Sequence, residues 1–263
     1  AVVPMLPFPL SDNLCSLRPH VPRLTLTCLM DLNSEGEVVH HDIFESVIRS
    51  ARRFTYEEVE SLLKGETALD VSPPVQNAVS RMGRLARQLR DRRFARGSLD
   101  FDFPEPYIVV DDQGWPLDAR RRERGESHKL IEEFMLLANE TVAQAMADVP
   151  FLYRIHERPD PAKMQNLEKT LRAVGVAGPT GLHDGKPAAL QKVMAGVKGK
   201  PVEPMVHMMI LQSLKQAIYS PKNAGHFGLA STAYTHFTSP IRRYPDLIVH
   251  RLAKERANAR LTP

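Results

Sequence analysis

The spacing of apolar residues changes period along this chain, and that change constrains the fold most. Residues Leu24, Leu26, Cys28, Met30 and Leu32 alternate with more polar ones. A period of two is typical of a half-buried β-strand. Turn-forming residues follow over 33–36, and the residues from Val38 to Arg49 read as a second strand. The pattern therefore predicts an antiparallel hairpin near the N-terminus.

From residue 55 onwards the spacing is mainly helical. Thr55 and Glu58 form a capping-box pattern that predicts a helix ending at Gly65. Other helices are expected over 75–89, 127–147, 160–174, 186–197, 203–219 and 240–259, with strands over 101–110 and 151–155. Residues Ser11 to Leu14 resemble an N-cap cluster that opens a short helical turn. The expected fold class is α+β, with antiparallel strands early and many helices.

Composition excludes several classes of protein. The chain has 263 residues and only two cysteines, so it is not a disulfide scaffold, and its thiol-poor composition suits a reducing compartment. No apolar run approaches the ~20 residues that span a bilayer. We therefore expect a cytoplasmic protein with no membrane partner. The pI of 9.1 favours a polyanionic partner.

Arginine is concentrated in two places. The expected helix over 75–89 and its end carry Arg81, Arg84, Arg87, Arg90, Arg92, Arg93 and Arg96. A nearby expected loop carries Arg120, Arg121, Arg122 and Arg124. Arginine matches phosphate geometry well, but a solvated helix face has the same composition. We favour the solvated face for the helix, and both interpretations stay open for the loop.

Residues 226–246 combine hydroxyls, imidazoles, aromatic rings and two adjacent arginines. Thr238 or Ser239 is the expected N-cap of the last helix, which would place Arg242 and Arg243 in its first turn. Positive charge at a helix N-terminus is unfavourable by up to about 1 kcal/mol, so its presence there indicates a bound anion such as phosphate. The alternative is a capped helix with surface arginines, and we favour the anion site.

Carboxylates give a weaker signal. Glu132 and Glu133 interrupt an apolar helix face, and spacing alone favours one exposed and one paired glutamate. Asp111-Asp112 precedes Gln113-Gly114, which is typical of a hairpin turn rather than a metal site. The sequence contains no Gly-rich phosphate loop, no HExxH motif and no Gly-x-Ser-x-Gly elbow. We assign no metal ligand in this chain.

Several sequence motifs together resemble those of the ribonuclease II/ribonuclease R family of exoribonucleases. Their residues are closer to those of ribonuclease R. The most specific phrase includes His226-Phe227-Gly228-Leu229, Tyr234, the run from Thr238 to Asp246, and His250-Arg251. Val3-Pro4-Met5-Leu6-Pro7, the run from His128 to Glu133, Arg154-Ile155-His156 and the run from Lys215 to Tyr219 agree in the same order. The resemblance spans nearly all of residues 1–259.

The resemblance implies an RNA-degrading fold and assigns roles to individual residues. The family hydrolyses RNA processively from the 3′ end to nucleoside 5′-monophosphates, using Mg²⁺ held by four aspartates. By resemblance, Arg242 touches the scissile phosphate, Tyr56 and Glu132 contact the 3′-terminal nucleotides and select ribose, and Phe101 stacks on bases. His226, Ser239, Arg243 and Tyr244 lie in the family's signature and are expected to bind the single-stranded RNA 3′ end.

The position of the motifs implies an incomplete catalytic domain. In the family, the aspartates precede the Val-Pro-Met-Leu-Pro motif, which begins here at Val3. We therefore expect residues 1–263 to lack the Mg²⁺ ligands, the end of the catalytic domain and the flanking β-barrels, and to be inactive alone. The alternatives are a non-catalytic RNA-binding module built on the same groove and a structural or protein-interaction remnant without RNA affinity.

Overall fold

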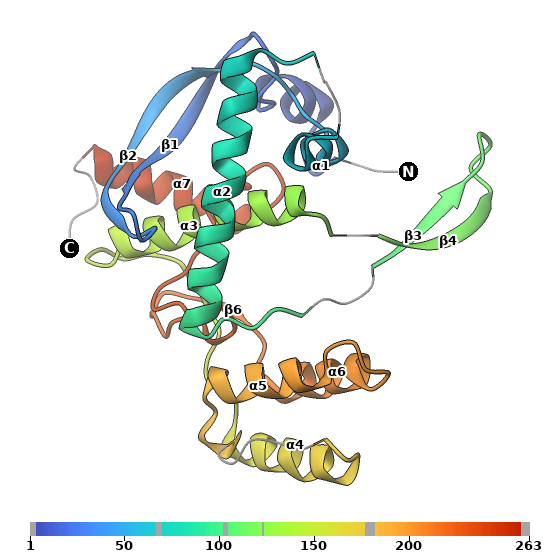
Figure 1. Ribbon diagram of the computed structural model, residues 1–263. Coiled ribbons are helices and arrows are strands. Elements are labelled where there is room, and N and C mark those ends of the chain that lie inside the picture. The colour runs from blue at the N-terminus through green and yellow to red at the C-terminus, as the bar shows by residue number, and fades with distance from the viewer. Residues whose placement is uncertain (1–3, 67–69, 102–104, 123, 177–181, 259–263) are drawn as a thin grey trace.

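A computed structural model describes residues 4–66, 70–101, 105–122, 124–176 and 182–258 of the chain. It confirms the α+β class: helices predominate, and the described strands form three separate antiparallel pairs (Figure 1). The helices are α1 (Tyr56–Lys64), α2 (Pro73–Arg96), α3 (Glu126–Ala145), α4 (Pro161–Ala173), α5 (Pro187–Val197), α6 (Glu203–Ser213) and α7 (Tyr244–Ala257), with short turns η1 (Pro9–Leu14), η2 (Leu182–Asp184) and η3 (Phe227–Leu229).

The expected N-terminal hairpin is present as β1 (Pro22–Leu32) and β2 (Val38–Arg49). Its register pairs Leu26 with Glu45 and Cys28 with Ile43. Leu26, Cys28 and Ile43 pack on a core cluster formed by α3, α7 and the segments around β5 (Tyr153–Ile155). The apolar face of the hairpin, which the period-two pattern predicts, therefore packs on one side of the core around α3.

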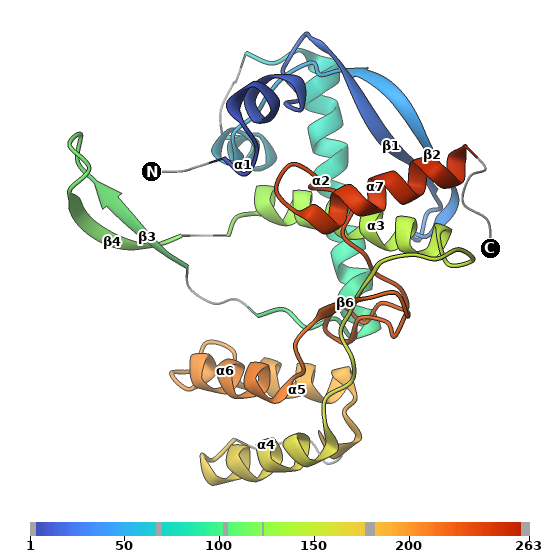
Figure 2. The same cartoon turned by 180° about the vertical axis from the view of Figure 1, so that it is seen from behind.

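Helix α3 is the central element of the fold. Helix α2 crosses it on one side, and α7 lies on the other (Figures 1 and 2). Its second half is almost entirely buried, with Val142 and Ala143 at 0% exposure. Since α3 is held from both sides, side chains on its first turns have fixed positions.

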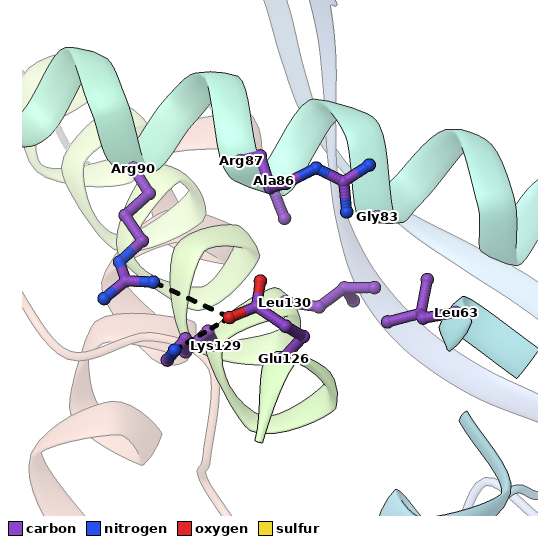
Figure 3. Close-up of a pocket in the computed structure, with 8 residues that line it drawn as sticks. All are labelled: Leu63, Gly83, Ala86, Arg87, Arg90, Glu126, Lys129 and Leu130. Atoms are coloured by element: carbon purple, nitrogen blue, oxygen red, sulfur yellow. Dashed lines mark hydrogen bonds and ion pairs between the residues drawn. The ribbon is translucent and has the colours of Figure 1, made fainter. Parts of the chain in front are cut away.

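Helix α1 begins as the sequence predicts. The Thr55 hydroxyl accepts from the Glu58 N–H, the Glu58 carboxylate accepts from the Thr55 N–H at 2.7 Å, and Gly65 ends the helix with a φ of 71°. A small pocket is lined by side chains of α1, α2 and α3 where the three helices meet (Figure 3). There Gly83 of α2 approaches Leu63 so closely that an added Cβ would lie 2.5 Å from Leu63 Cδ2. The missing side chain allows α1 to pack tightly on α2.

Helices α4, α5 and α6 lie together at the opposite end of the protein from η1 (Figures 1 and 2). They bury a second core cluster of aliphatic side chains, which also receives Leu99 and Phe227. The predicted helix over 203–219 is wrong in its last third. Helix α6 ends at Ser213, because residues 218–220 form β6 (Ile218–Ser220) and pair with β5.

The second hairpin consists of β3 (Glu105–Val110) and β4 (Pro116–Arg122) and projects from the body (Figure 1). The turn at Asp111 is confirmed, since its carboxylate accepts from the N–H groups of Gln113 and Trp115. The expected loop over 120–122 is wrong: these arginines continue a strand whose backbone pairs with β3. Residues 102–104 of the expected strand over 101–110 lie outside the described residues.

Residues Ser11 to Leu14 do not open a helical turn. They lie inside η1, which begins at Pro9 and has Phe8 in the N-cap position. In the described part of the chain, no helix combines the length and the apolar character that crossing a membrane requires.

Candidate nucleic-acid interface

The structure brings Tyr56 and Glu132 to one neighbourhood at the start of α3. Tyr56 is the first residue of α1 and stacks on His128, with ring centroids 4.0 Å apart and planes 10° from parallel. Glu132 follows His128 by four residues, so both lie on one face of α3. Tyr56 keeps 42% of its surface exposed. Tyr56 therefore stacks on the face of α3 that also carries Glu132, one turn further along.

The two adjacent glutamates of α3 have different environments. Glu133 is 3% exposed and forms a bidentate ion pair with the equally buried Arg93. Glu132 is about one-third exposed, at 32% of its side chain, and pairs with Arg124. A guanidinium nitrogen of Arg93 lies 3.9 Å from it. One glutamate is thus paired inside the protein and the other is accessible, as the spacing favoured: Glu133 is the buried one and Glu132 the accessible carboxylate.

Phe101 follows Asp100, which is connected to Glu132 through Arg124. The Asp100 carboxylate accepts from Arg124 at 3.1 Å, and Arg124 in turn contacts Glu132. The Phe101 ring packs partly buried against the α4–α6 core and meets His207 edge to face at 6.0 Å. Arg124 therefore links the expected ribose-selecting Glu132 to Asp100, the residue that precedes the expected base-stacking Phe101.

Two clefts flank this group. One, of about 1210 Å³, is lined by α1, α2 and the first turns of α3 and includes Tyr56. The other, of about 510 Å³, lies between the end of α2 and helices α5 and α6, with Asp100, Arg124, Lys198 and His207 in its wall. The group thus has open space on both sides, as a site for an extended ligand needs.

A second group lies in the turn before α7, and here the expected helix start is wrong. The helix begins at Tyr244, with Arg243 rather than Thr238 or Ser239 in the N-cap position. The N–H groups of Arg242 and Arg243 donate to the Ser239 carbonyl, which forms a turn ahead of the helix. Pro245 lies in the first turn of α7, where a proline is tolerated, and a helix that began near residue 240 would carry it in its interior. Asp246, which is fully buried, accepts from the Ser239 N–H at 2.7 Å and holds the turn in place.

The two arginines of this turn have different partners. Arg243 donates to Asp246 at 2.8 Å, so its charge is balanced within the protein. Arg242 is exposed, and no carboxylate in the described residues forms an ion pair with it. Tyr244 is 69% exposed. Arg242 and Tyr244 are therefore free to meet a ligand, whereas Arg243 holds the turn.

His226 lies away from the solvent-facing side chains of the turn. Its Nδ1 accepts from the Leu229 N–H at 3.3 Å, and its ring lies 5.1 Å from that of His156 and 5.3 Å from that of Tyr234. Burial, followed by the nearby His156 and Arg154, lowers the pKa of His226 to about 3. The ring is therefore neutral near pH 7 and cannot contribute a positive charge to phosphate binding.

The family resemblance assigned no role to three residues beside this turn: Arg154, Tyr219 and His236. Arg154 on β5 faces Tyr219 on β6, and its guanidinium lies 4.6 Å from the centre of the Tyr219 ring. The Tyr219 hydroxyl and His236 Nδ1 are 2.6 Å apart. Pairing between two three-residue strands brings these residues together, and neither strand has a pattern long enough to predict that pairing.

The described carboxylates do not fit a Mg²⁺ site. Among the residues placed in the structure, no group of three or more His, Cys, Asp and Glu side chains could hold a metal ion. Asp246 is taken up by Arg243 and Ser239, and Glu132 by Arg124. Hard divalent cations need several convergent oxygen ligands, so we derive no step through Mg²⁺ from these residues.

Comparison with known proteins gives one consistent result. Residues 1–258 match the RNB domain family. The chain is 44% identical over 256 residues to ribonuclease R of Thermotoga maritima, covering 96% of this chain and 36% of that protein. It is 38% identical over 256 residues to ribonuclease R of Escherichia coli, covering 96% of this chain and 31% of that protein. The chain thus spans about a third of the length of the curated relatives it matches.

Solved structures agree with the sequence matches. Ribonuclease R of Mycoplasma genitalium, in complex with ribose-methylated single-stranded RNA, superimposes with a TM-score of 0.92 at 32% identity. That match covers 97% of this chain and 40% of the other. The yeast pseudonuclease Ssd1 shares the fold, with a TM-score of 0.70 at 23% identity, covering 96% of this chain and 31% of that one.

Proposed function

Because this chain belongs to the RNB domain family, we propose that it forms the RNA-holding part of a processive 3′→5′ exoribonuclease. The enzyme would hydrolyse single-stranded RNA to nucleoside 5′-monophosphates. One observation carries the proposal: Tyr56, Glu132 and the Phe101 segment, which lie far apart in sequence, are joined around the first turns of α3. In this proposal, residues 1–263 are an incomplete catalytic domain.

Each residue of this neighbourhood has a role that its chemistry supports. The Glu132 carboxylate accepts a hydrogen bond from a ribose 2′-hydroxyl, the group that distinguishes RNA from DNA. Tyr56, which is partly exposed beside it, contacts the same terminal nucleotides. Phe101 stacks on a base, an interaction worth about 1–3 kcal/mol that tolerates any sequence. Together they hold the 3′ end of an RNA of any sequence.

The turn before α7 contributes the electrostatic part. The exposed Arg242 guanidinium stabilises negative charge that develops on the scissile phosphate. Tyr244 lies exposed two residues further on and contacts the RNA. Arg243 and Ser239 act on the RNA through the shape of the turn, since Asp246 binds the Arg243 guanidinium and the Ser239 N–H. His226 offers only a neutral ring, and its contact with RNA would be a hydrogen bond or stacking.

Mg²⁺ enters this proposal from the family rather than from the described residues. Two-metal hydrolysis uses the ions to activate water and to stabilise the leaving oxygen. The ligands would be aspartates outside the described part of this chain. Arg242 cannot replace them, because a guanidinium does not generate a nucleophile. We also propose a cytoplasmic location, where the substrate RNA and a reducing medium are found.

The test compares the product of the whole gene with the 263-residue chain, using a 5′-labelled single-stranded oligoribonucleotide. We expect the gene product to shorten the RNA stepwise from the 3′ end and to release mononucleotides only with Mg²⁺. The isolated chain should bind the RNA without shortening it. Release of mononucleotides by the chain alone would contradict its proposed inactivity.

The alternative is a non-catalytic RNA-binding module on the same groove. The fold alone does not exclude it, since the fold also occurs in a protein described as a pseudonuclease. The named relatives favour the enzyme, because they are ribonucleases R at 38–44% identity. A gene product that binds RNA tightly but leaves it intact with Mg²⁺ would decide for the module.

A further inference from the structure

A group of mutually contacting side chains lies beside the turn that carries Arg242, and it consists of Arg154, Tyr219 and His236. None of them has a role in the proposed exonuclease function. Strand pairing sets Arg154 opposite Tyr219. The backbone N–H of Arg154 donates to the backbone carbonyl of Tyr234 at 2.8 Å. The guanidinium is stacked 4.6 Å from the Tyr219 ring centre. A cation over an aromatic face is attracted to the ring, which restricts the orientations of its side chain. The Arg154 side chain is therefore pre-positioned, although it is half-buried.

Positive charge exceeds negative charge around this group. Burial is the main cause that lowers the pKa of His236 to about 4, and the charges of Arg243, Arg154 and Arg242 lower it further. Asp246 is the acidic group that acts on the same ring, and it is bound to Arg243. In the part of the chain that the structure describes, no carboxylate forms an ion pair with Arg154 or Arg242. The half-buried Arg154 and the exposed Arg242 are thus two guanidinium groups without counter-ions among the described residues.

His236 adds a neutral donor to the same place. Its low pKa keeps the ring uncharged near pH 7. When the Tyr219 hydroxyl donates to Nδ1 across 2.6 Å, the single ring proton of His236 lies on Nε2. The group then offers a planar arginine fork and an imidazole N–H, which are donors suited to an anion and not to a cation.

We propose that Arg154, with His236 as a second donor, binds a backbone phosphate of the RNA next to the phosphate that Arg242 contacts. The inference rests on the proposed exonuclease function and extends its site by one nucleotide. Arg154 lies over the Tyr219 ring whose hydroxyl contacts His236, and His236 precedes Arg242 by six residues. Consecutive phosphates of one strand suit two such cations. A guanidinium fork binds phosphate oxygens bidentately, which fixes the register of the strand.

The experiment measures the affinity of the full-length gene product for a single-stranded oligoribonucleotide at several salt concentrations. Arg154→Gln should weaken binding about 10-fold, the effect of losing a hydrogen bond to a charged group. It should also reduce the slope of log K against log salt by about 0.7, which corresponds to one lost phosphate contact. Arg154→Lys should keep the slope and lose part of the affinity. The control is Arg158→Ala, an exposed arginine four residues further along.

The outcomes separate this inference from the proposed function. An Arg154→Gln protein with wild-type affinity and slope overturns the phosphate contact and leaves the exonuclease proposal intact. An equal loss of RNA affinity in Arg158→Ala assigns the effect to general surface charge. That outcome also overturns the phosphate contact of Arg154. If the wild-type protein does not bind RNA at all, both proposals fail. Thermal unfolding of each variant checks its fold, and Arg154→Lys carries the comparison if the Gln variant is unstable.

Discussion

Arg93 and Glu133 form a bidentate ion pair inside the protein, between α2 and α3. Arg93 Nε lies 3.1 Å from both carboxylate oxygens, and a terminal nitrogen lies 2.5 Å from one of them. The remaining terminal nitrogen of Arg93 donates to the Ser98 hydroxyl at 2.7 Å. Both side chains are nearly inaccessible, at 6% and 3% exposure. This pair fixes the helix on which the accessible Glu132 lies.

We predict that Glu133→Ala destabilises the protein by about 3–5 kcal/mol, because it leaves the Arg93 guanidinium buried without its counter-ion. Urea unfolding of the purified chain measures the loss. The matched control is Arg92→Ala, which breaks the exposed pair between Arg92 and Glu37 and should cost under about 1 kcal/mol. Equal decreases in the free energy of unfolding of the two variants would show that the buried pair stabilises the protein no more than the exposed pair does.

Glu132→Gln should narrow the preference for RNA over DNA, since the amide replaces the carboxylate that accepts from the 2′-hydroxyl. We expect the ratio of the RNA and DNA degradation rates of the gene product to fall about 10-fold. Glu126→Gln, an exposed change on the same helix, is the control and should leave the ratio unchanged. Unaltered discrimination in Glu132→Gln would reject the assigned role.

Phe101→Leu tests stacking without removing an apolar side chain from the α4–α6 core. A lost base–aromatic contact of about 1–3 kcal/mol corresponds to roughly 5- to 150-fold weaker binding of short RNA 3′ ends. Fluorescence anisotropy with a labelled oligoribonucleotide measures the change. Tyr107→Leu, in the projecting hairpin, should bind as the wild type does. If Phe101→Leu retains normal affinity, Phe101 does not stack on the RNA.

Local signals predicted much of the fold. The capping box at Thr55 and Glu58 and the alternation in β1 depend on neighbours within a few residues, and both were confirmed. One error lies where a distant partner decides, since pairing with Ile155 turns Ile218 into a strand residue. The other is local: Pro245 is tolerated only in the first turn of a helix, so α7 starts at Tyr244. The family resemblance named the site residues, but only the structure places Arg124 between Asp100 and Glu132.

Arg242→Ala should slow RNA hydrolysis by the gene product about 10²- to 10³-fold in kcat, the usual effect of removing one group that stabilises transition-state charge. Its stability should change little, because Arg242 is exposed. Single-turnover kinetics on saturating RNA measures the chemical step. Arg251→Ala, an exposed arginine on α7, is the control and should retain the wild-type rate. A normal chemical rate in Arg242→Ala would remove Arg242 from the catalytic role.

Two half-buried imidazoles predict a loss of stability in mild acid. Burial lowers the pKa of His226 to about 3 and that of His236 to about 4, while the unfolded chain protonates both near pH 6.5. Between about pH 6.5 and 4.5 the unfolded state therefore binds more protons, and the free energy of unfolding falls by up to about 1.4 kcal/mol per pH unit for each histidine. Denaturant unfolding across this range should show that slope, and His236→Gln should reduce it by about one histidine's share. His40→Gln, an exposed change on β2, should leave the slope as it is. A wild-type stability that stays constant from pH 6.5 to 4.5 would contradict the half-buried, neutral state of these two rings.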